Sequence, residues 1–242
     1  MTPVLRCTVI SLLALALTGC SGRQVQPSDP DIDPWESYNR KMHAFNMGFD
    51  RVLLRPIARG YDVVMPDAPQ RGVRNFFRNL SYPVTFLNLL LQGKFEESAN
   101  ATGRFLVNSK LGLFGFFDVA SKGGLAPYDE DFGQTLAVWG WEESRYLVIP
   151  FIGPYTVRDF LGRSFYGYFH PISYRIREYD DYSLLVIDLV TLRAELLPFQ
   201  QQIDNANDPY TLVRDVYLQN REFEIYDGDP PAPDYDALLE YD

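Results

Sequence analysis

The sequence is poor in the residues from which covalent cross-links and metal sites are built. It contains two cysteines, Cys7 and Cys20, and two histidines, His43 and His170, among 242 residues. Because Cys7 lies in a predicted signal peptide and Cys20 at its cleavage site, no pair of thiols remains for a disulfide in the mature chain. The histidines are far apart in sequence, and HExxH and CxxC motifs are missing, which argues against a transition-metal site.

Motifs of catalysis and nucleotide binding are also missing. The sequence has no glycine-rich loop with a lysine that could hold a phosphate, and no carboxylate pair is distinguished by its spacing. Residues 162–167 read Gly-Arg-Ser-Phe-Tyr-Gly, one residue too long for a nucleophile elbow. His43 fits a packed position on a helix better than a catalytic base, and His170 fits a loop. We therefore expect no enzyme and no cofactor, and a net charge of −10 disfavours nucleic-acid binding.

Long hydrophobic runs are lacking after the first 19 residues, since no stretch reaches the roughly 18 apolar residues of a spanning helix. Short apolar runs occur at 84–91 and 111–119, and they fit either a buried core or segments that lie in lipid without crossing it. Residues 34–122 carry 12 Lys/Arg against 7 Asp/Glu, whereas residues 123–242 carry 8 against 22. This division of charge would be explained if the basic half contacts anionic lipid and the acidic half faces water or a basic partner. It would also be explained if both halves simply form ordinary solvated surfaces.

The N-terminus carries the clearest positive signal. Arg6 precedes an apolar run over 9–17, and the run ends in Leu17-Thr18-Gly19-Cys20. This order is typical of a secretory signal that is cleaved before a lipidated cysteine. We expect a signal peptide over 1–19, acylation of Cys20 and a flexible tether over 20–32. An ordinary signal peptide with a chance cysteine is the alternative.

Residues 33–226 are expected to form one mainly α-helical domain. Asp33 would cap a helix that runs from Pro34 to about Val52. Further helices are expected between Pro56 and Pro66, over 68–80, from Pro83 to Gly93, and over 94–110, 182–197 and 209–226. The helix over 182–197 has a seam of Leu185, Leu189, Leu192 and Leu196. Thr135–Trp139 and Tyr146–Ile149 predict two strands within a hairpin region of about 131–154. The last segment, 227–242, is acidic and proline-containing, which predicts a disordered tail.

Several short runs stand in one order along the chain. They are Asp33–Arg40, Phe45-Asn46, Asn79-Leu80, Leu91–Gly93, Arg104–Asn108, Gly112, Gly115, Asp118–Ala120, Asp131–Leu136, Leu147–Pro150, Gly153-Pro154, Arg158-Asp159, Asp208–Tyr210, Arg214-Asp215 and Tyr217–Gln219. Together, over roughly 33–228, they resemble the MlaA (VacJ) family of outer-membrane lipoproteins. One departure is Trp141–Arg145, where the family is usually glycine-rich.

The resemblance implies a ring-shaped, monotopic helical membrane protein with a short β-hairpin-like segment. It would be embedded in the inner leaflet of the outer membrane, on the periplasmic side, and would associate with a porin trimer. It would take mislocalised phospholipid from the outer leaflet through an amphipathic passage to a periplasmic carrier (MlaC-like), which maintains lipid asymmetry. A structural lipoprotein that docks to porin and moves no lipid is the alternative.

Individual roles follow from the same resemblance as hypotheses. Control of the lipid passage is assigned to Phe45, Asn46, Phe132, Gly133, Gly153 and Pro154. Support of the ring is assigned to Arg104 and Asp118.

Overall fold

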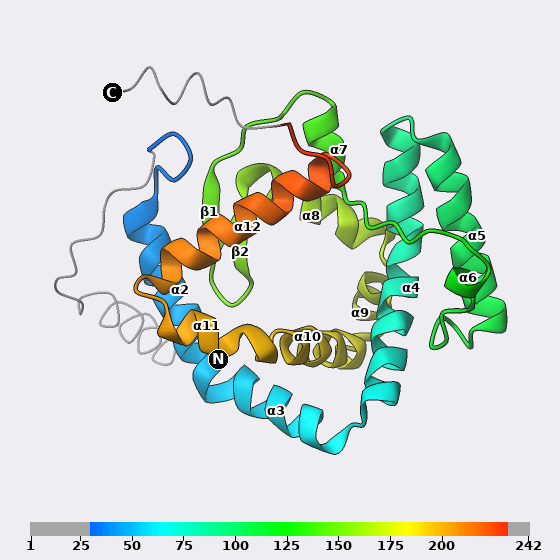
Figure 1. Cartoon of the computed structure of the whole chain (residues 1–242), viewed down its shortest axis with the longest axis horizontal. Coiled ribbons are helices and arrows are strands. Elements are labelled where there is room, and N and C mark those ends of the chain that lie inside the picture. The colour runs from blue at the N-terminus through cyan, green and yellow to red at the C-terminus, as the bar shows by residue number, and fades with distance from the viewer. Residues whose placement is uncertain (1–29, 232–242) are drawn as a thin grey trace.

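The structure, a computed structural model, describes residues 30–231, and in this range it is mainly helical (Figure 1). Its elements are α2 (Glu36–Phe49), the π-helical turn η1 (Asp50–Leu54), α3 (Arg55–Val64), α4 (Asp67–Leu91), α5 (Phe95–Leu111), α6 (Val119–Lys122), α7 (Phe132–Val138), β1 (Tyr146–Ile149), β2 (Gly153–Thr156), α8 (Val157–Phe169), α9 (Pro171–Tyr179), α10 (Ser183–Glu195), the 3₁₀ turn η2 (Leu197–Phe199), α11 (Gln200–Asn205) and α12 (Pro209–Ile225). The predicted signal peptide, Cys20 and most of the predicted tether and acidic tail lie outside the described residues.

The helices surround a central opening (Figure 1). Following the contacts, α2 leads through η1 to α3, then to α10, α4, α7 and α12, and α12 packs back on α2. Helix α5 packs on α4, and α5 and α6 lie on the side of α4 away from the opening. A mainly helical ring with a short hairpin is therefore confirmed.

The first side of the ring is one helical run from Glu36 to Val64 that changes direction at η1 (Figure 1). The short helix expected between Pro56 and Pro66 is present as α3, but the expected interruption between Val52 and Pro56 is wrong. Pro56 lies in the first turn of α3, where its missing N–H and fixed φ are tolerated. A π-helical turn shifts the hydrogen-bond pattern and is a recognised cause of a helix bend, so η1 forms a corner of the ring.

Asp33 does not cap the first helix, contrary to expectation. Helix α2 begins at Glu36 after Trp35, which makes no side-chain capping bond. The Asp33 carboxylate is buried and instead accepts hydrogen bonds from Asn39 Nδ2 at 2.8 Å and from the Tyr210 hydroxyl of α12. Asn39 also binds β1, donating to the Tyr146 carbonyl and accepting from the Val148 N–H. The segment thus joins α2, β1 and α12 rather than starting a helix.

The sequence pattern predicted that a new helix starts at Pro83, and this prediction is wrong. Pro83 lies inside α4, which runs unbroken for 25 residues. A proline inside a helix costs one hydrogen bond and a steric conflict, about 3 kcal/mol. Contacts with α5, α7, α8, α9 and α10 along its length offset this cost.

Of the two strands predicted for the hairpin, the first is wrong and the second is correct. Thr135–Val138 belongs to helix α7, whose N-terminus is capped by Asp131 through the Gln134 N–H at 3.0 Å. The second expected strand is correct, but its partner is Gly153–Thr156, in antiparallel register from Tyr146 with Thr156 to Ile149 with Gly153. The short helix α7, capped at its start, satisfies the hydrogen-bonding groups of the backbone up to Gly140. This outweighs the preference of Thr135–Trp139 for a β-strand.

The apolar core is small and divided. One cluster joins α4 and α5 through Tyr82, Leu89 and Ala101, and another joins β1 and α12 through Tyr146, Val148 and Tyr210. The predicted leucine seam of α10 is not buried, since its four leucines are 40–53% exposed whereas Thr191 and Ala194 face inward. Within residues 30–231, no helix combines the length and hydropathy needed to traverse a bilayer.

Ion pairs join the ring where its elements meet. Arg40 of α2 binds Asp208 at the start of α12 at 2.9 Å, and Arg74 of α4 binds Glu195 of α10 at 2.8 Å. Asp50 of η1 pairs with an arginine of α10, Arg193. Because residues 30–231 contain no cysteine, charge-assisted hydrogen bonds between planar arginine and carboxylate groups supply the directional links between these elements.

Candidate functional site

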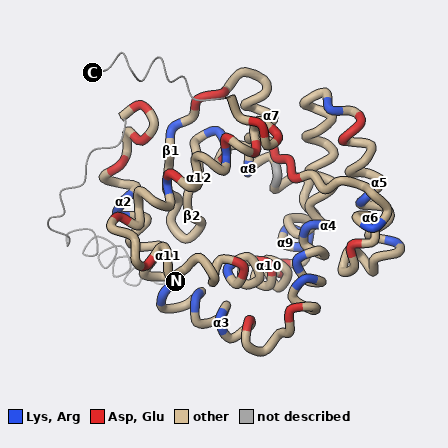
Figure 2. Tube along the Cα trace, in the orientation of Figure 1, with Lys and Arg blue, Asp and Glu red and all other residues tan. Residues whose placement is uncertain are grey.

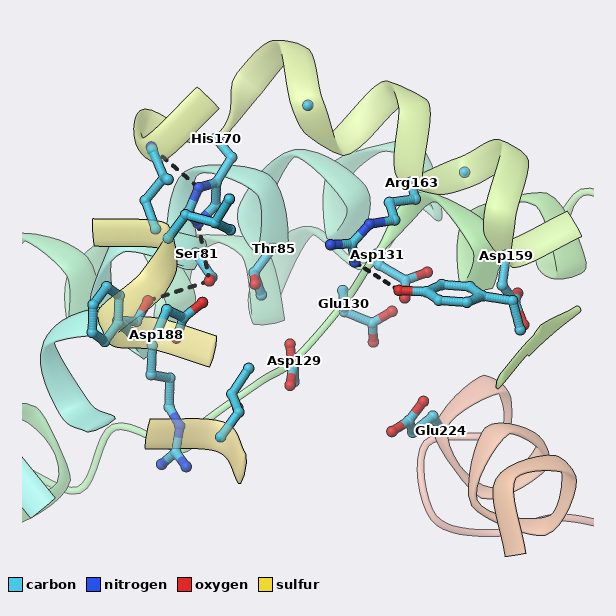
Figure 3. A pocket seen from close by; sticks show the side chains of 18 of the residues that line it. Ser81, Thr85, Asp129, Glu130, Asp131, Asp159, Arg163, His170, Asp188 and Glu224 are labelled. Atoms are coloured by element: carbon cyan, nitrogen blue, oxygen red, sulfur yellow. Dashed lines mark hydrogen bonds between the residues drawn. The ribbon is translucent and has the colours of Figure 1, made fainter. Parts of the chain in front are cut away.

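A cavity of about 710 Å³ lies inside the ring. Its walls come from α4, β2, α8, α9, α10, α12 and the segment that leads into α7, and side chains from these elements point into the same space (Figure 3). Apolar groups such as Phe77, Ile172 and Leu192 share the lining with charged groups. Such a mixed wall can hold a ligand that has both a polar and an apolar part.

The charged lining is more acidic than basic. Seven carboxylate residues face four arginines, and they are Asp129, Glu130, Asp131, Asp159, Asp188, Glu195 and Glu224 against Arg74, Arg78, Arg163 and Arg221. Figure 2 shows acidic and basic residues on the elements around the opening. Because the cavity walls exclude part of the solvent, this imbalance gives the cavity a negative potential.

One part of the wall is a buried charge network between α7, α8 and α12. Nη2 of Arg221 lies 2.6 Å from Asp131 Oδ1 and 3.1 Å from Asp159 Oδ1. Nε of Arg158 donates to the same Asp159 oxygen at 3.0 Å. Burial by itself would raise the pKa of Asp159, but Arg221 and Arg158 hold this pKa below its ordinary value. The network fixes the hairpin end of α8 to α12.

Gly133 lies against this network. A Cβ at this position would be 2.5 Å from Asp159 Oδ1 and 2.6 Å from Arg221 Nη2. On the opposite helix, a Cβ at Gly162 would be 2.7 Å from the Gly133 nitrogen. The two glycines therefore allow α7 and α8 to approach at backbone contact, with the ion pairs filling the remaining space.

His170 lies in the connection between α8 and α9, as the sequence predicted, and there it is the buried N-cap residue of α9. Its Nδ1 accepts the Ile172 N–H at 3.3 Å at the start of α9, and its Nε2 lies 3.3 Å from Ser81 Oγ. Burial lowers the pKa of His170 to about 4. Since Nδ1 is an acceptor, Nε2 carries the proton and cannot take one from Ser81, so this contact is not a nucleophile with its base.

Phe45 and Asn46 contact the hairpin tip rather than the cavity. Asn46 Nδ2 donates to the Ile149 carbonyl at 2.9 Å, and its Oδ1 accepts the Phe151 N–H at 2.7 Å. The Phe45 ring meets the Phe151 ring edge-on at 4.9 Å. Phe151 is 60% exposed and has a left-handed φ of 65°, so α2 holds a strained turn in place.

The other residues assigned to the passage lie on two elements. Phe132 stacks on Phe165 of α8 at 4.0 Å, and Gly133 packs on the charge network. Gly153 begins β2 with a φ of +116° that favours glycine, and Pro154 follows it. Of the six assigned residues, Pro154 alone is among the cavity-lining residues of the described chain.

Arg104 and Asp118 pair outside the ring wall. Arg104 is 1% exposed, and its Nη2 lies 3.0 and 3.1 Å from the two Asp118 carboxylate oxygens. Its Nε donates to the hydroxyl of Tyr82 on α4 at 2.7 Å. With Asn108 and Ser121 as further partners, the pKa of Asp118 falls to about 2 despite the opposing effect of burial. The pair fastens α5 and α6 to the back of α4.

The cavity residues that sequence reasoning missed are mainly on α8, α10 and α12. Arg221 and Glu224 continue a stripe with Tyr210, Arg214 and Tyr217 at spacings of three and four, a signal that a search for apolar stripes passes over. Arg163 carries no comparable local signal, whereas Asp188 is the one charged residue within the apolar run 184–190. Within residues 30–231, no group of three His, Cys, Asp or Glu residues has the geometry to hold a metal ion.

Comparison with known proteins gives a consistent result. The model of the MlaA lipoprotein family matches residues 31–224. An uncharacterized protein of Rickettsia typhi is 37% identical over 195 residues, which cover 80% of this chain and 78% of that protein. The intermembrane phospholipid transport system lipoprotein MlaA of Haemophilus influenzae is 32% identical over 223 residues, which cover 90% of this chain and 89% of that protein. A solved structure that concerns the maintenance of bacterial outer-membrane lipid asymmetry matches with a TM-score of 0.70 and 31% identity, covering 80% of this chain and 98% of that chain.

Proposed function

Because this chain belongs to the MlaA lipoprotein family, we propose that it is an outer-membrane lipoprotein that moves phospholipid and so maintains the lipid asymmetry of that membrane. It removes mislocalised phospholipid from the outer leaflet and passes it through the ring to a periplasmic carrier. Transport of this kind needs a path that shields acyl chains and keeps a headgroup hydrated.

The observation that carries the proposal is the amphipathic cavity inside the ring. Exposing an acyl chain to water costs about 0.8 kcal/mol per CH₂ group, so a lipid in transit needs apolar contact along its tails. The cavity offers Phe77, Ile176 and Leu185 beside its carboxylates and arginines. A headgroup can remain hydrated at the charged wall while the tails follow the apolar one.

The outer surface supports a seat in one leaflet. Along η1 and α3, three valines are 80–85% exposed: Val52, Val63 and Val64. Exposing these apolar side chains to water is unfavourable, and contact with acyl chains removes this cost. Leu113 and Phe114, after α5, are 64% and 72% exposed in left-handed backbone conformations. We place these surfaces in the inner leaflet, with Cys20 acylated and the chain on the periplasmic side.

Two protein partners follow from the same proposal. An outer-membrane porin trimer would hold the ring within the membrane, and a periplasmic phospholipid carrier of the MlaC kind would receive the lipid. The hairpin, held by Phe45 and Asn46, and the region from Phe132 to Pro154 would control access to the passage. Pro154 does so from the cavity wall, whereas Gly133 and Gly153 act through the backbone positions of α7 and β2. Arg104 and Asp118 would support the ring from behind α4.

Lipid content of the purified protein tests the proposal. The full chain, released from native membranes in a mild detergent, should carry phospholipid in native mass spectrometry. A lipoprotein that only docks to porin would carry none. In cells, deletion of the gene should place phospholipid in the outer leaflet and raise detergent sensitivity, and normal leaflet composition in that strain would contradict transport.

Blocking the cavity separates transport from docking in the same cells. Leu192 and Leu196 are both 53% exposed and four residues apart near the end of α10, but only Leu192 lines the cavity. Leu192→Trp should fail to restore outer-leaflet composition while remaining associated with porin. Leu196→Trp, the matched control, should restore it.

A further inference from the structure

Four charged side chains of the cavity form no ion pair with any other residue of the range 30–231. Within the described chain, the carboxylates of Asp129 and Asp188 have no hydrogen-bond or ion-pair partner, although both line the cavity (Figure 3). Arg78 likewise has none, and Arg163 donates to the Tyr155 hydroxyl at 2.6 Å but to no carboxylate. Two anions and two cations are thus available to a ligand.

These four side chains contrast with the rest of the wall, where arginines and carboxylates are paired. Arg74 binds Glu195 at 2.8 Å, and Arg221 binds Asp131, Asp159 and Glu224 at 2.6–3.1 Å. Burial raises the pKa of Asp188 to about 6, with Glu195 adding to the effect and Arg163 opposing it. A carboxylate in this position gains stability from a cation brought to it.

We propose that the cavity selects zwitterionic phospholipids whose headgroup carries an ammonium group over phospholipids with a net negative headgroup. The inference rests on the proposed transport function and names the lipid class that this function favours. Arg78 or Arg163 would bind the phosphate, and Asp129 or Asp188 the ammonium group. An anionic headgroup would satisfy the arginines only, and it would also meet a lining in which seven carboxylates outnumber four arginines.

Competitive lipid capture tests this selection. The full-length lipidated protein is stripped of lipid in nonionic detergent and mixed with vesicles of equimolar phosphatidylethanolamine and phosphatidylglycerol that share the same acyl chains. Bound lipid is then measured by native mass spectrometry. We expect phosphatidylethanolamine to exceed phosphatidylglycerol by about threefold to fivefold, the contribution of one partly exposed ion pair.

Paired variants assign the selection to the cavity. Asp129→Asn with Asp188→Asn should bring the ratio close to one. Glu96→Gln with Glu178→Gln changes the net charge equally at two exposed positions outside the cavity, and it should leave the ratio unchanged.

The outcomes separate two failures. If the wild-type protein binds both lipids equally, or prefers phosphatidylglycerol, the selection is refuted while the transport proposal stands. If it captures no phospholipid at all, both are refuted. An equal loss of preference in the control pair would assign the effect to overall charge and would also overturn the inference.

Discussion

Replacement of Gly133 by alanine tests the close approach of α7 and α8 around the buried charge network. The added Cβ would lie 2.5 Å from Asp159 Oδ1, 2.6 Å from Arg221 Nη2 and 3.0 Å from the Asp159 Cα. Relief by side-chain rotation is blocked, because Asp159 is held by Arg158 at 3.0 Å and by the Thr156 hydroxyl at 2.7 Å. Either the helices separate or the ion pairs lengthen.

The expected cost combines these two effects. Overpacking a close-packed site costs about 1–3 kcal/mol, and weakening a buried ion pair adds to it. We expect Gly133→Ala to lower the free energy of unfolding by about 2–4 kcal/mol. Gly60→Ala is the matched control, since Gly60 lies inside α3 and a Cβ at this position would have no neighbouring atom within 4 Å. There alanine should raise the free energy of unfolding by about 0.5–1 kcal/mol, because it restricts the unfolded chain.

Urea unfolding in nonionic detergent, followed by far-ultraviolet circular dichroism, measures both variants. Opposite signs are expected for the two alanines. If Gly133→Ala were neutral or stabilising, the close approach of α7 to Asp159 would be refuted. A double variant, Gly133→Ala with Arg221→Met, tests the same contact. The two effects should be non-additive, because the shorter methionine side chain leaves room for the new methyl group of Ala at position 133.

Three further predictions address other parts of the molecule. Asn46→Ala removes both side-chain hydrogen bonds to the hairpin tip. Hydrogen-exchange mass spectrometry should then show amide exchange at Phe151 that is roughly 5- to 30-fold faster, and an unchanged rate would contradict the contact. Arg104→Met leaves the Asp118 carboxylate without its ion-pair partner and should cost about 3–5 kcal/mol in urea unfolding, whereas a loss below about 1 kcal/mol would refute a structural role. Burial raises the pKa of Glu130 to about 7 from 4.5. The stability that Glu130 contributes is therefore full below pH 4.5 and is lost as the pH rises through 7. In thermal unfolding, Glu130→Gln should lack this fall in stability between pH 4.5 and 7.

Local sequence signals predicted much of the helical fold. Asp208-Pro209 places a capping residue before a proline, and α12 begins there, with Asp208 accepting the Tyr210 and Thr211 N–H groups. The amphipathic pattern of 94–110 likewise matches α5. These signals are correct because they depend on residues within one or two helical turns.

Three expectations failed where contacts beyond the local sequence decide the structure. Asp33 could cap a helix, but Asn39 and Tyr210 bind its carboxylate more completely. Pro83 would end an isolated helix, but α4 is packed along both halves. The strand expected at 135–139 is replaced by α7, which packs on α8 and α12. In each case the competing interactions join residues that are remote in sequence or require a whole helix to be in place.

The sequence by itself determined most of the helix-forming segments and, through its ordered residue runs, the family. The tertiary structure alone decided which side chains face the cavity and which charges are left without partners there. Arg163 and Asp188 are 25 positions apart on different helices, and although Asp188 interrupts the apolar run 184–190, nothing along the chain pairs it with Arg163. Closure of the ring brings them into one enclosed space, where solvent screening is reduced and their charges can act on a headgroup.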